Sequence, residues 1–122
     1  MIGLQSISKS SFVEIKSYAA PPRAVEAVAE ATCILFATKP LYDNFKKLLN
    51  QRDLITSLCN YDPDSISDYA LNELKKYIND PNFKQEYVVR ISVACAAICQ
   101  LIIALYNFKT TKNLVSDLFS SF

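Results

Sequence analysis

The scarcity of glycine limits the fold of this 122-residue chain more than any other feature of its sequence. The chain has one glycine, Gly3, and five prolines. Proteins rich in β-structure need many tight turns with positive φ, a conformation that glycine adopts most readily. The sequence therefore predicts an all-α fold with short polar loops. Hydrophobic residues make up 51% and charged residues 20%, enough for one buried core and too apolar for a disordered chain.

Prolines and polar turns divide the chain into predicted helices. An apolar stripe over residues 4–18 predicts a first helix, which the pair Pro21-Pro22 ends because proline lacks an amide donor. The same pair suits the start of a second helix, which we expect to run to about Phe36. Shorter helices are predicted over residues 41–49, 53–59 and 66–78, the last preceded by a capping box over 65–68.

The segment after Pro81 has neither glycine nor proline, so we expect one long helix from about Lys84 to the end of the sequence. In its second half, apolar residues recur at alternating steps of four and three, the 3.5-residue period of a coiled-coil seam. Lys112 interrupts this series. The predicted coiled-coil seam consists of Leu101, Leu105, Phe108, Val115 and Phe119.

A seam of this kind needs a partner helix, and the first segment is the other unpaired apolar helix. We expect the two ends to pair as an antiparallel hairpin, with residues 1–20 as the outgoing helix and residues 98–122 as the returning one. Residues 21–97 would then form a helical bundle at the closed tip. This arrangement predicts that the sequence was cut from a longer protein, whose two helices continue as a rod.

Charge and hydropathy argue against two classes of partner. The net charge of +1 gives no overall case for nucleic acid, although residues 39–52 are basic and residues 53–86 acidic. The most apolar stretch, residues 88–106, is interrupted by Arg90 and Gln100, and the uninterrupted run is shorter than the ~20 residues that span a bilayer. We therefore expect a buried core helix and no membrane, with a membrane-embedded hairpin as a minor alternative.

The sequence offers no catalytic or cofactor chemistry. It has no histidine, and one glycine cannot form a phosphate-binding loop. Asp62 and Asp64 are better explained as helix-capping residues than as an acid/base pair. We expect no catalytic residue, no metal and no cofactor, and a binding domain that is not an enzyme. The four cysteines are expected to be reduced and buried: Cys33, Cys59, Cys95 and Cys99.

Several stretches together resemble one known family. Residues 13–25 combine an acid, an alternating apolar pattern and a Pro-Pro pair before a helix, as where a dynein stalk enters its tip. Residues 58–62, followed by Ile66, resemble the turn into the central helix of that tip, and residues 77–83 and 86–95 resemble its final helix. The chain thus resembles, over nearly its whole length, the microtubule-binding domain of a dynein heavy chain, axonemal rather than cytoplasmic.

The resemblance implies a compact bundle of about six short helices at the tip of an antiparallel two-stranded coiled coil. It also implies ATP-sensitive attachment to microtubules at the groove between α- and β-tubulin, with affinity set by the coiled-coil register. ATP hydrolysis would take place in a distant motor ring. The implied location is the cytoplasm and cytoskeleton, in the axoneme of a cilium or flagellum. An accessory dynein light chain is a second partner that the resemblance allows.

The resemblance assigns microtubule-binding roles to charged residues. Lys47 and Arg52 match basic positions that face tubulin, and Lys46 lies beside Lys47 on the same predicted helix. Arg90 matches an arginine near the start of the last helix, and Glu86 matches an acidic position one turn earlier. Their four-residue spacing allows Glu86 and Arg90 to pair, which would make the arginine less available to an acidic partner.

One position departs from the family. Glu26 stands where cytoplasmic members carry a lysine, and a carboxylate opposed to acidic tubulin would lower affinity or steer specificity. Arg23, almost one turn away, is expected to compensate and completes the predicted site.

A rival hypothesis is a helical-hairpin scaffold that binds a partner protein through an apolar groove. Such binding responds little to salt, whereas binding through exposed charges weakens as salt is added. Salt dependence therefore separates the two hypotheses.

Overall fold

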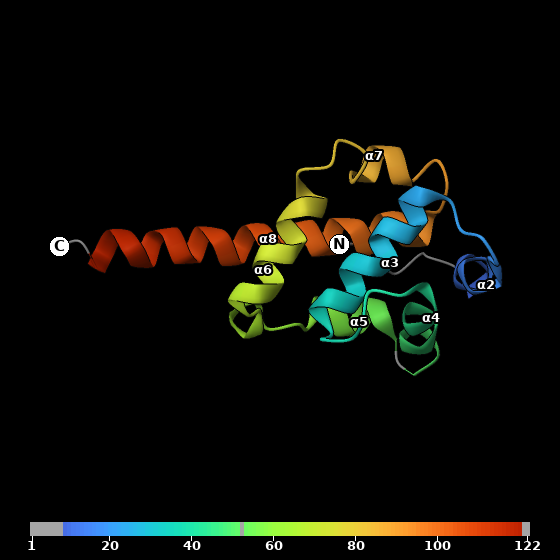
Figure 1. Cartoon of the computed structure of the whole chain (residues 1–122), viewed down its shortest axis with the longest axis horizontal. Helices are drawn as coiled ribbons and strands as arrows, with labels where there is room; N and C mark the ends of the chain where they lie inside the picture. The colour runs from blue at the N-terminus through green and yellow to red at the C-terminus, as the bar shows by residue number, and fades with distance from the viewer. Residues whose placement is uncertain (1–8, 52, 121–122) are drawn as a thin grey trace.

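The computed structural model describes residues 9–51 and 53–120, which form helices and turns without a strand. This confirms the all-α prediction. The elements are α2 (Lys9–Ser17), α3 (Arg23–Leu35), α4 (Tyr42–Gln51), α5 (Leu54–Cys59), the 3₁₀ helix η1 (Pro63–Ser65), α6 (Asp68–Ile78), α7 (Gln85–Val88) and α8 (Val93–Ser120). The other helices gather around the inner half of α8 (residues 93–106), and its outer half (residues 107–120) projects away from them (Figure 1).

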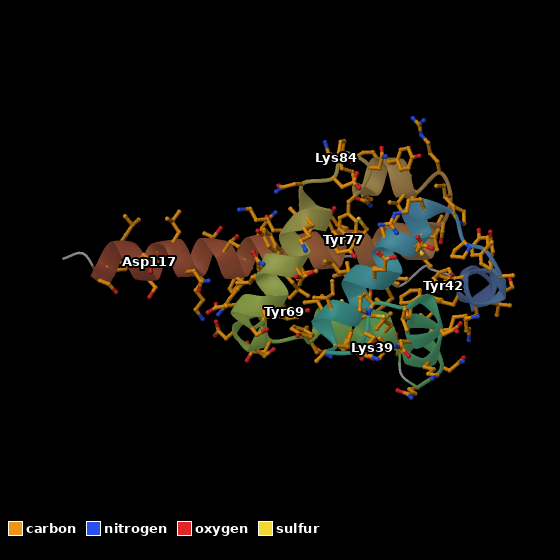
Figure 2. The ribbon with its side chains drawn as sticks, in the orientation of Figure 1. Lys39, Tyr42, Tyr69, Tyr77, Lys84 and Asp117 are labelled. Atoms are coloured by element: carbon orange, nitrogen blue, oxygen red, sulfur yellow. The ribbon has the colours of Figure 1, made fainter. Side chains whose placement is uncertain are left out.

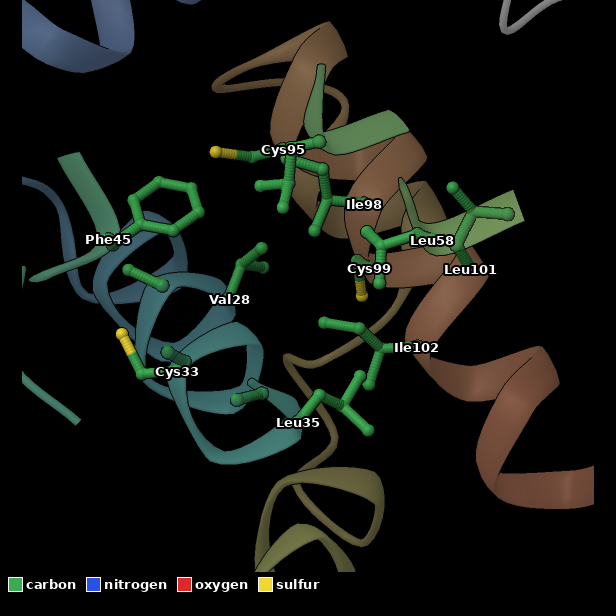
Figure 3. Packing of buried hydrophobic residues seen from close by; sticks show 14 of the residues in the cluster. Val28, Cys33, Leu35, Phe45, Leu58, Cys95, Ile98, Cys99, Leu101 and Ile102 are labelled. Carbon is green, nitrogen blue, oxygen red and sulfur yellow. The ribbon is translucent and has the colours of Figure 1, made fainter. Parts of the chain in front are cut away.

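The core lies where the inner half of α8 packs against α3. Figure 3 shows Val28 of α3 on the side that faces Ile98 and Ile102 of α8. Phe45 of α4 and Leu58 of α5 belong to the same hydrophobic cluster, and at most 1% of the surface of any of these five residues is exposed. The apolar faces that the sequence periodicity predicted therefore meet in one core.

Three of the four cysteines are part of this core. Cys33, Cys95 and Cys99 are buried free thiols, as predicted, and burial raises the pKa of Cys95 to about 11 and that of Cys99 to about 12. The prediction is wrong for Cys59, which is exposed. Leu54 and Leu58 supply the buried face of α5, and Cys59 follows Leu58 directly, so the helix turns it about 100° away from the core.

The predicted continuous last helix is interrupted before α8. The backbone N–H of Arg90 donates to the carbonyl of Tyr87 (3.3 Å), and that of Ile91 donates to the carbonyl of Val88 (2.9 Å). These i→i−3 bonds form a tight turn. The Ser92 hydroxyl then accepts a hydrogen bond from the N–H of Cys95 (3.1 Å), which starts α8 at Val93. The expectation of one helix was wrong because Ser92 acts as a helix cap.

The described residues do not form the antiparallel pair that was predicted from the two ends of the chain. Figure 1 shows α2 end-on while α8 runs across the view, so the two helices cross. The Tyr42 hydroxyl of α4 donates to the Ile15 carbonyl (2.6 Å), and Lys16 Nζ donates to Asn50 Oδ1 (3.2 Å). These bonds and the fully buried Ile15 hold the end of α2 against α4. Residues 1–8, which the prediction also needs, lie outside the described residues.

The predicted seam divides into two parts. Leu101 and Leu105 are buried in the bundle, whereas Phe108, Val115 and Phe119 are 58%, 44% and 74% exposed. In the described ranges, no second helix runs beside the outer half of α8, where Figure 2 labels Asp117. One helix of these ranges, α8, is long and apolar enough to cross a membrane, but 44% of its most apolar stretch is buried inside the bundle.

Helix caps explain most of the aspartate-rich turn before α6. The Asp62 carboxylate accepts from the N–H of Asp64 (3.0 Å) and caps η1, as predicted. The Ser67 hydroxyl accepts from the N–H of Ala70 (3.1 Å), so α6 begins two residues later than a cap at Ser65 would place it. Asp64 was also predicted to be a capping residue, but its carboxylate instead contacts Lys112 and Lys109 of α8.

Candidate functional site

Arg23 opens α3 and makes two ion pairs within that helix. Its Nη1 lies 2.6 Å from Glu26 Oε1 and 2.9 Å from Glu30 Oε2. These residues are spaced three and four apart, so their side chains share one helix face. Glu30 also accepts a hydrogen bond from the Tyr77 hydroxyl of α6 (2.8 Å). Arg23 is therefore paired with Glu26, and through Glu30 it belongs to a network that spans two helices, α3 and α6.

The charge balance of this network limits what Arg23 can offer a partner. One guanidinium faces the carboxylates Glu26 and Glu30, so the group carries a formal charge of −1. Hydrogen bonds to Glu30 and Glu26 raise the pKa of Arg23 still further, and it stays charged at any working pH. The side chain is nevertheless 64% exposed. While Arg23 is paired with Glu26 and Glu30, it adds little attraction for a negatively charged surface. To bind such a surface strongly, it would have to exchange these carboxylates for acidic groups of the partner.

Sequence reasoning missed two members of the network, Glu30 and Tyr77. The spacing of Glu30 from Glu26 was visible in the sequence, but Tyr77 arrives from a helix 47 residues away. Burial and the bond to Glu30 raise the pKa of Tyr77, so its hydroxyl remains the donor at neutral pH.

The two lysines of α4 differ in their surroundings. Lys46 is 32% exposed, and its Nζ lies 3.6 Å from Asp43 Oδ1 and 5.8 Å from the centre of the Tyr42 ring. Lys47 is exposed, and no ion pair joins it to another described residue. Arg52 lies outside the described residues. On α4, Lys47 is thus the cation most available to a partner.

Glu86 and Arg90 are both exposed near the start of α8 but do not form the predicted ion pair within the described part of the chain. Glu86 lies in α7, which ends at Val88, and Arg90 lies in the tight turn that follows. An i,i+4 pair requires a continuous α-helix, and the i→i−3 bonds of this turn change the direction of Arg90.

The elements that carry these charges lie around one end of the bundle. Figure 1 shows α4 and α7 on opposite sides of it, at the end away from the outer half of α8. Lys84, labelled in Figure 2, precedes α7. The structure brings Arg23 and Glu26 together, but it does not gather Lys46, Lys47, Glu86 and Arg90 into one cluster. Residues 9–51 and 53–120 hold no group of three or more His, Cys, Asp or Glu that could bind a metal.

Known proteins resemble this chain along most of its length. The family described as the microtubule-binding stalk of dynein motor matches residues 2–116. Human dynein axonemal heavy chain 14 is 35% identical over 115 residues, which cover 94% of this chain and 3% of that protein. The cytoplasmic dynein heavy chain of Caenorhabditis elegans is 30% identical over 117 residues, again 94% of this chain and 3% of that protein.

The fold agrees with a solved structure. The microtubule-binding domain of dynein-c superposes with a TM-score of 0.79 at 27% identity, covering 92% of this chain and 81% of that one. Human dynein axonemal heavy chain 2 is 36% identical over 105 residues, 86% of this chain and 2% of that protein. The chain thus spans about 2–3% of the length of these curated relatives. Sequence and fold agree that this chain belongs to the family of microtubule-binding stalk domains of dynein motors.

Proposed function

We propose that this chain attaches a dynein motor reversibly to microtubules, at the groove between α- and β-tubulin. The observation that carries the proposal is the match of residues 2–116 to the microtubule-binding stalk family. Its curated relatives include axonemal dynein heavy chains, so the proposed location is the axoneme of a cilium or flagellum. An accessory light chain is a further proposed partner.

Exposed basic residues at one end of the bundle would make the attachment. Lys47 is exposed on α4 and Arg90 is exposed in the turn before α8. The acidic surface of tubulin attracts such side chains over a distance of about one Debye length, which added salt shortens. Lys46 and Arg23, already paired with carboxylates, would contribute less. Arg52 completes the proposed set, and Glu86 is its acidic member.

The proposed sensitivity to ATP would reach this domain through the stalk. ATP hydrolysis would occur elsewhere in the parent heavy chain and shift one stalk helix along the other. Because the inner half of α8 forms much of the bundle core, a change in the position of α8 would be felt by α3, which packs against it. This provides a physical route from coiled-coil register to affinity.

Co-sedimentation with microtubules over a salt series tests the proposal. The chain should bind weakly, and the bound fraction should fall as salt rises. Lys47→Ala should weaken binding by up to about fivefold at low salt and flatten the salt dependence, because one exposed cation contributes little alone. Lys76→Ala is the matched control, since Lys76 is an exposed lysine of α6 outside the proposed surface.

A bound fraction that does not change with salt concentration would indicate binding through an apolar groove, as the rival scaffold hypothesis predicts. Equal losses in Lys47→Ala and Lys76→Ala would show that only net charge matters. Circular dichroism of both variants should remain that of the unsubstituted chain, because both lysines are exposed.

A further inference from the structure

An ion pair joins the outer half of α8 to the turn before α6. Lys112 Nζ lies 2.6 Å from Asp64 Oδ2, and Lys109 Nζ lies 3.9 Å from Asp64 Oδ1. Asp64 and Lys112 are 48 residues apart in the sequence. The ion pairs of Arg23, Lys46 and Lys76, by contrast, each join side chains within one helix, α3, α4 or α6. The Asp64 ion pairs instead link two elements, η1 and α8.

The lysines continue the face that α8 buries in the bundle. Ile98, Ile102 and Leu105 are buried, and Lys109 and Lys112 follow them at steps of four and three. Residues spaced in this way share one side of a helix. The buried face thus changes from aliphatic side chains to lysines where α8 leaves the core. Lys109 is only 16% exposed, so its aliphatic stem covers the edge of the core while its ammonium group reaches Asp64.

The same contact accounts for the one residue that interrupts the predicted coiled-coil seam. Lys112 stands between Phe108 and Val115 in the heptad series, where an apolar side chain would be expected. Asp64 lies in η1, which packs on α8 at this point. A lysine at position 112 therefore has a partner from the bundle, which an apolar residue would not have.

We propose that Asp64 is a positioning residue, which acts through Lys112 and Lys109 to fix the direction in which the outer half of α8 leaves the bundle. This goes beyond microtubule attachment, because it concerns how the stalk is held and not what the tip binds. A tilt or rotation of the stalk would reach the turn between α5 and α6 through this contact. The hydrogen bond from Lys112 holds the pKa of the Asp64 carboxyl below its usual value, so the pair remains charged at neutral pH.

The strength of the contact should be modest and sensitive to salt. The side chains of Asp64 and Lys112 are 51% and 53% exposed, so water and ions screen them. We therefore expect the loss of Asp64 to widen the range of α8 positions without unfolding the bundle.

Pulsed electron paramagnetic resonance on the whole chain tests the proposal. One spin label is placed on Cys59, the exposed cysteine of α5, and the other on α8 after Ser116→Cys. Cys33, Cys95 and Cys99 are buried and should remain unlabelled. The labelled parent should give one narrow distance distribution, and Asp64→Asn should broaden it. Lys112→Gln should broaden the peak less, because Lys109 still faces Asp64.

The double variant Asp64→Asn/Lys112→Gln should match Asp64→Asn alone, because Asp64→Asn already removes the interaction with both lysines. Asp64→Glu, which keeps the charge, should restore the narrow peak, and 1 M salt should broaden the parent but not Asp64→Asn. Lys76→Gln is the control, because its pair with Glu73 lies within α6 and should leave the distances unchanged.

An unchanged distribution in Asp64→Asn, or additive broadening in the double variant, would overturn the proposal. The measurement needs no microtubules, so its result stands apart from that of the co-sedimentation experiment.

Discussion

The two halves of α8 share one continuous helix but have opposite environments. In the inner half, the side chains from Ala94 to Cys99 are at most 7% exposed, and Ile102 is completely buried. In the outer half, Leu114, Leu118 and Phe119 are apolar as well, yet each is more than half exposed. An apolar side chain on a helix therefore does not by itself predict burial, which depends on whether another element lies beside that part of the helix.

The difference has a geometric cause. A helix of 28 residues is about 42 Å long, which is longer than the small bundle around it can cover. The elements α3, α5, α6 and α7 all contact α8, and beyond them η1 meets it near the start of the outer half through Asp64. The inner half thus contributes to stability, and the outer half offers a surface that the bundle leaves uncovered.

The largest expected effect of this difference is on thiol reactivity. At pH 8, Cys95 and Cys99 of the inner half should react with an aromatic disulfide reagent at least about a thousandfold more slowly than Cys59, because they must wait for the bundle to open. Burial raises their pKa values to about 11 and about 12, so little thiolate forms at this pH. In Ser116→Cys, the new thiol on the outer half should react about as fast as Cys59. Fast labelling of Cys95 in the folded chain would contradict this comparison.

Truncation of a core side chain should give the next largest effect. Ile102→Ala should lower the free energy of unfolding by about 2–5 kcal/mol, because Ile102 is fully buried and its loss leaves a cavity. Leu118→Ala is the matched control in the outer half and should change it by less than about 0.5 kcal/mol, since Leu118 is 56% exposed. Urea unfolding followed by circular dichroism measures both, and equal losses would mean that the outer half is also packed.

The smallest effect should come from weakening the outer half itself. Ser116→Gly should lower the helical signal, since glycine costs about 0.5 kcal/mol relative to serine in a helix without packing to offset it. The urea midpoint should stay the same, because residue 116 lies outside the cooperative core. A lowered midpoint would indicate that the two halves of α8 unfold together.

Much of the helical organisation could be predicted from local sequence. The Pro21-Pro22 pair precedes α3, which ends close to the predicted Phe36, and Asp53 caps α5 where a helix start was expected. Ser92 was overlooked because an isolated serine in an apolar, glycine-free segment is a weak signal for a helix boundary. The end of the helix at Val88 then separates Glu86 from Arg90, although their spacing suggested a pair.

In the candidate site, too, a contact between residues close in the sequence could be predicted, whereas contacts between distant residues could not. The contact of Arg23 with Glu26 follows from their spacing on one helix, so local sequence is enough to predict it. The bond from Tyr77 to Glu30 and the ion pair of Asp64 with Lys112 could not be predicted, because each joins residues more than 40 positions apart.

The sequence by itself determined that the chain is helical, where most of its helices begin, and which faces are apolar, because glycine, proline, capping residues and periodicity act within a few residues. Only the tertiary structure decided which apolar faces meet. It buried Leu101 and Leu105 but left Phe119 exposed. It also gave Lys112 its carboxylate partner, because burial and long-range pairing depend on what folds back beside a helix and not on the helix alone.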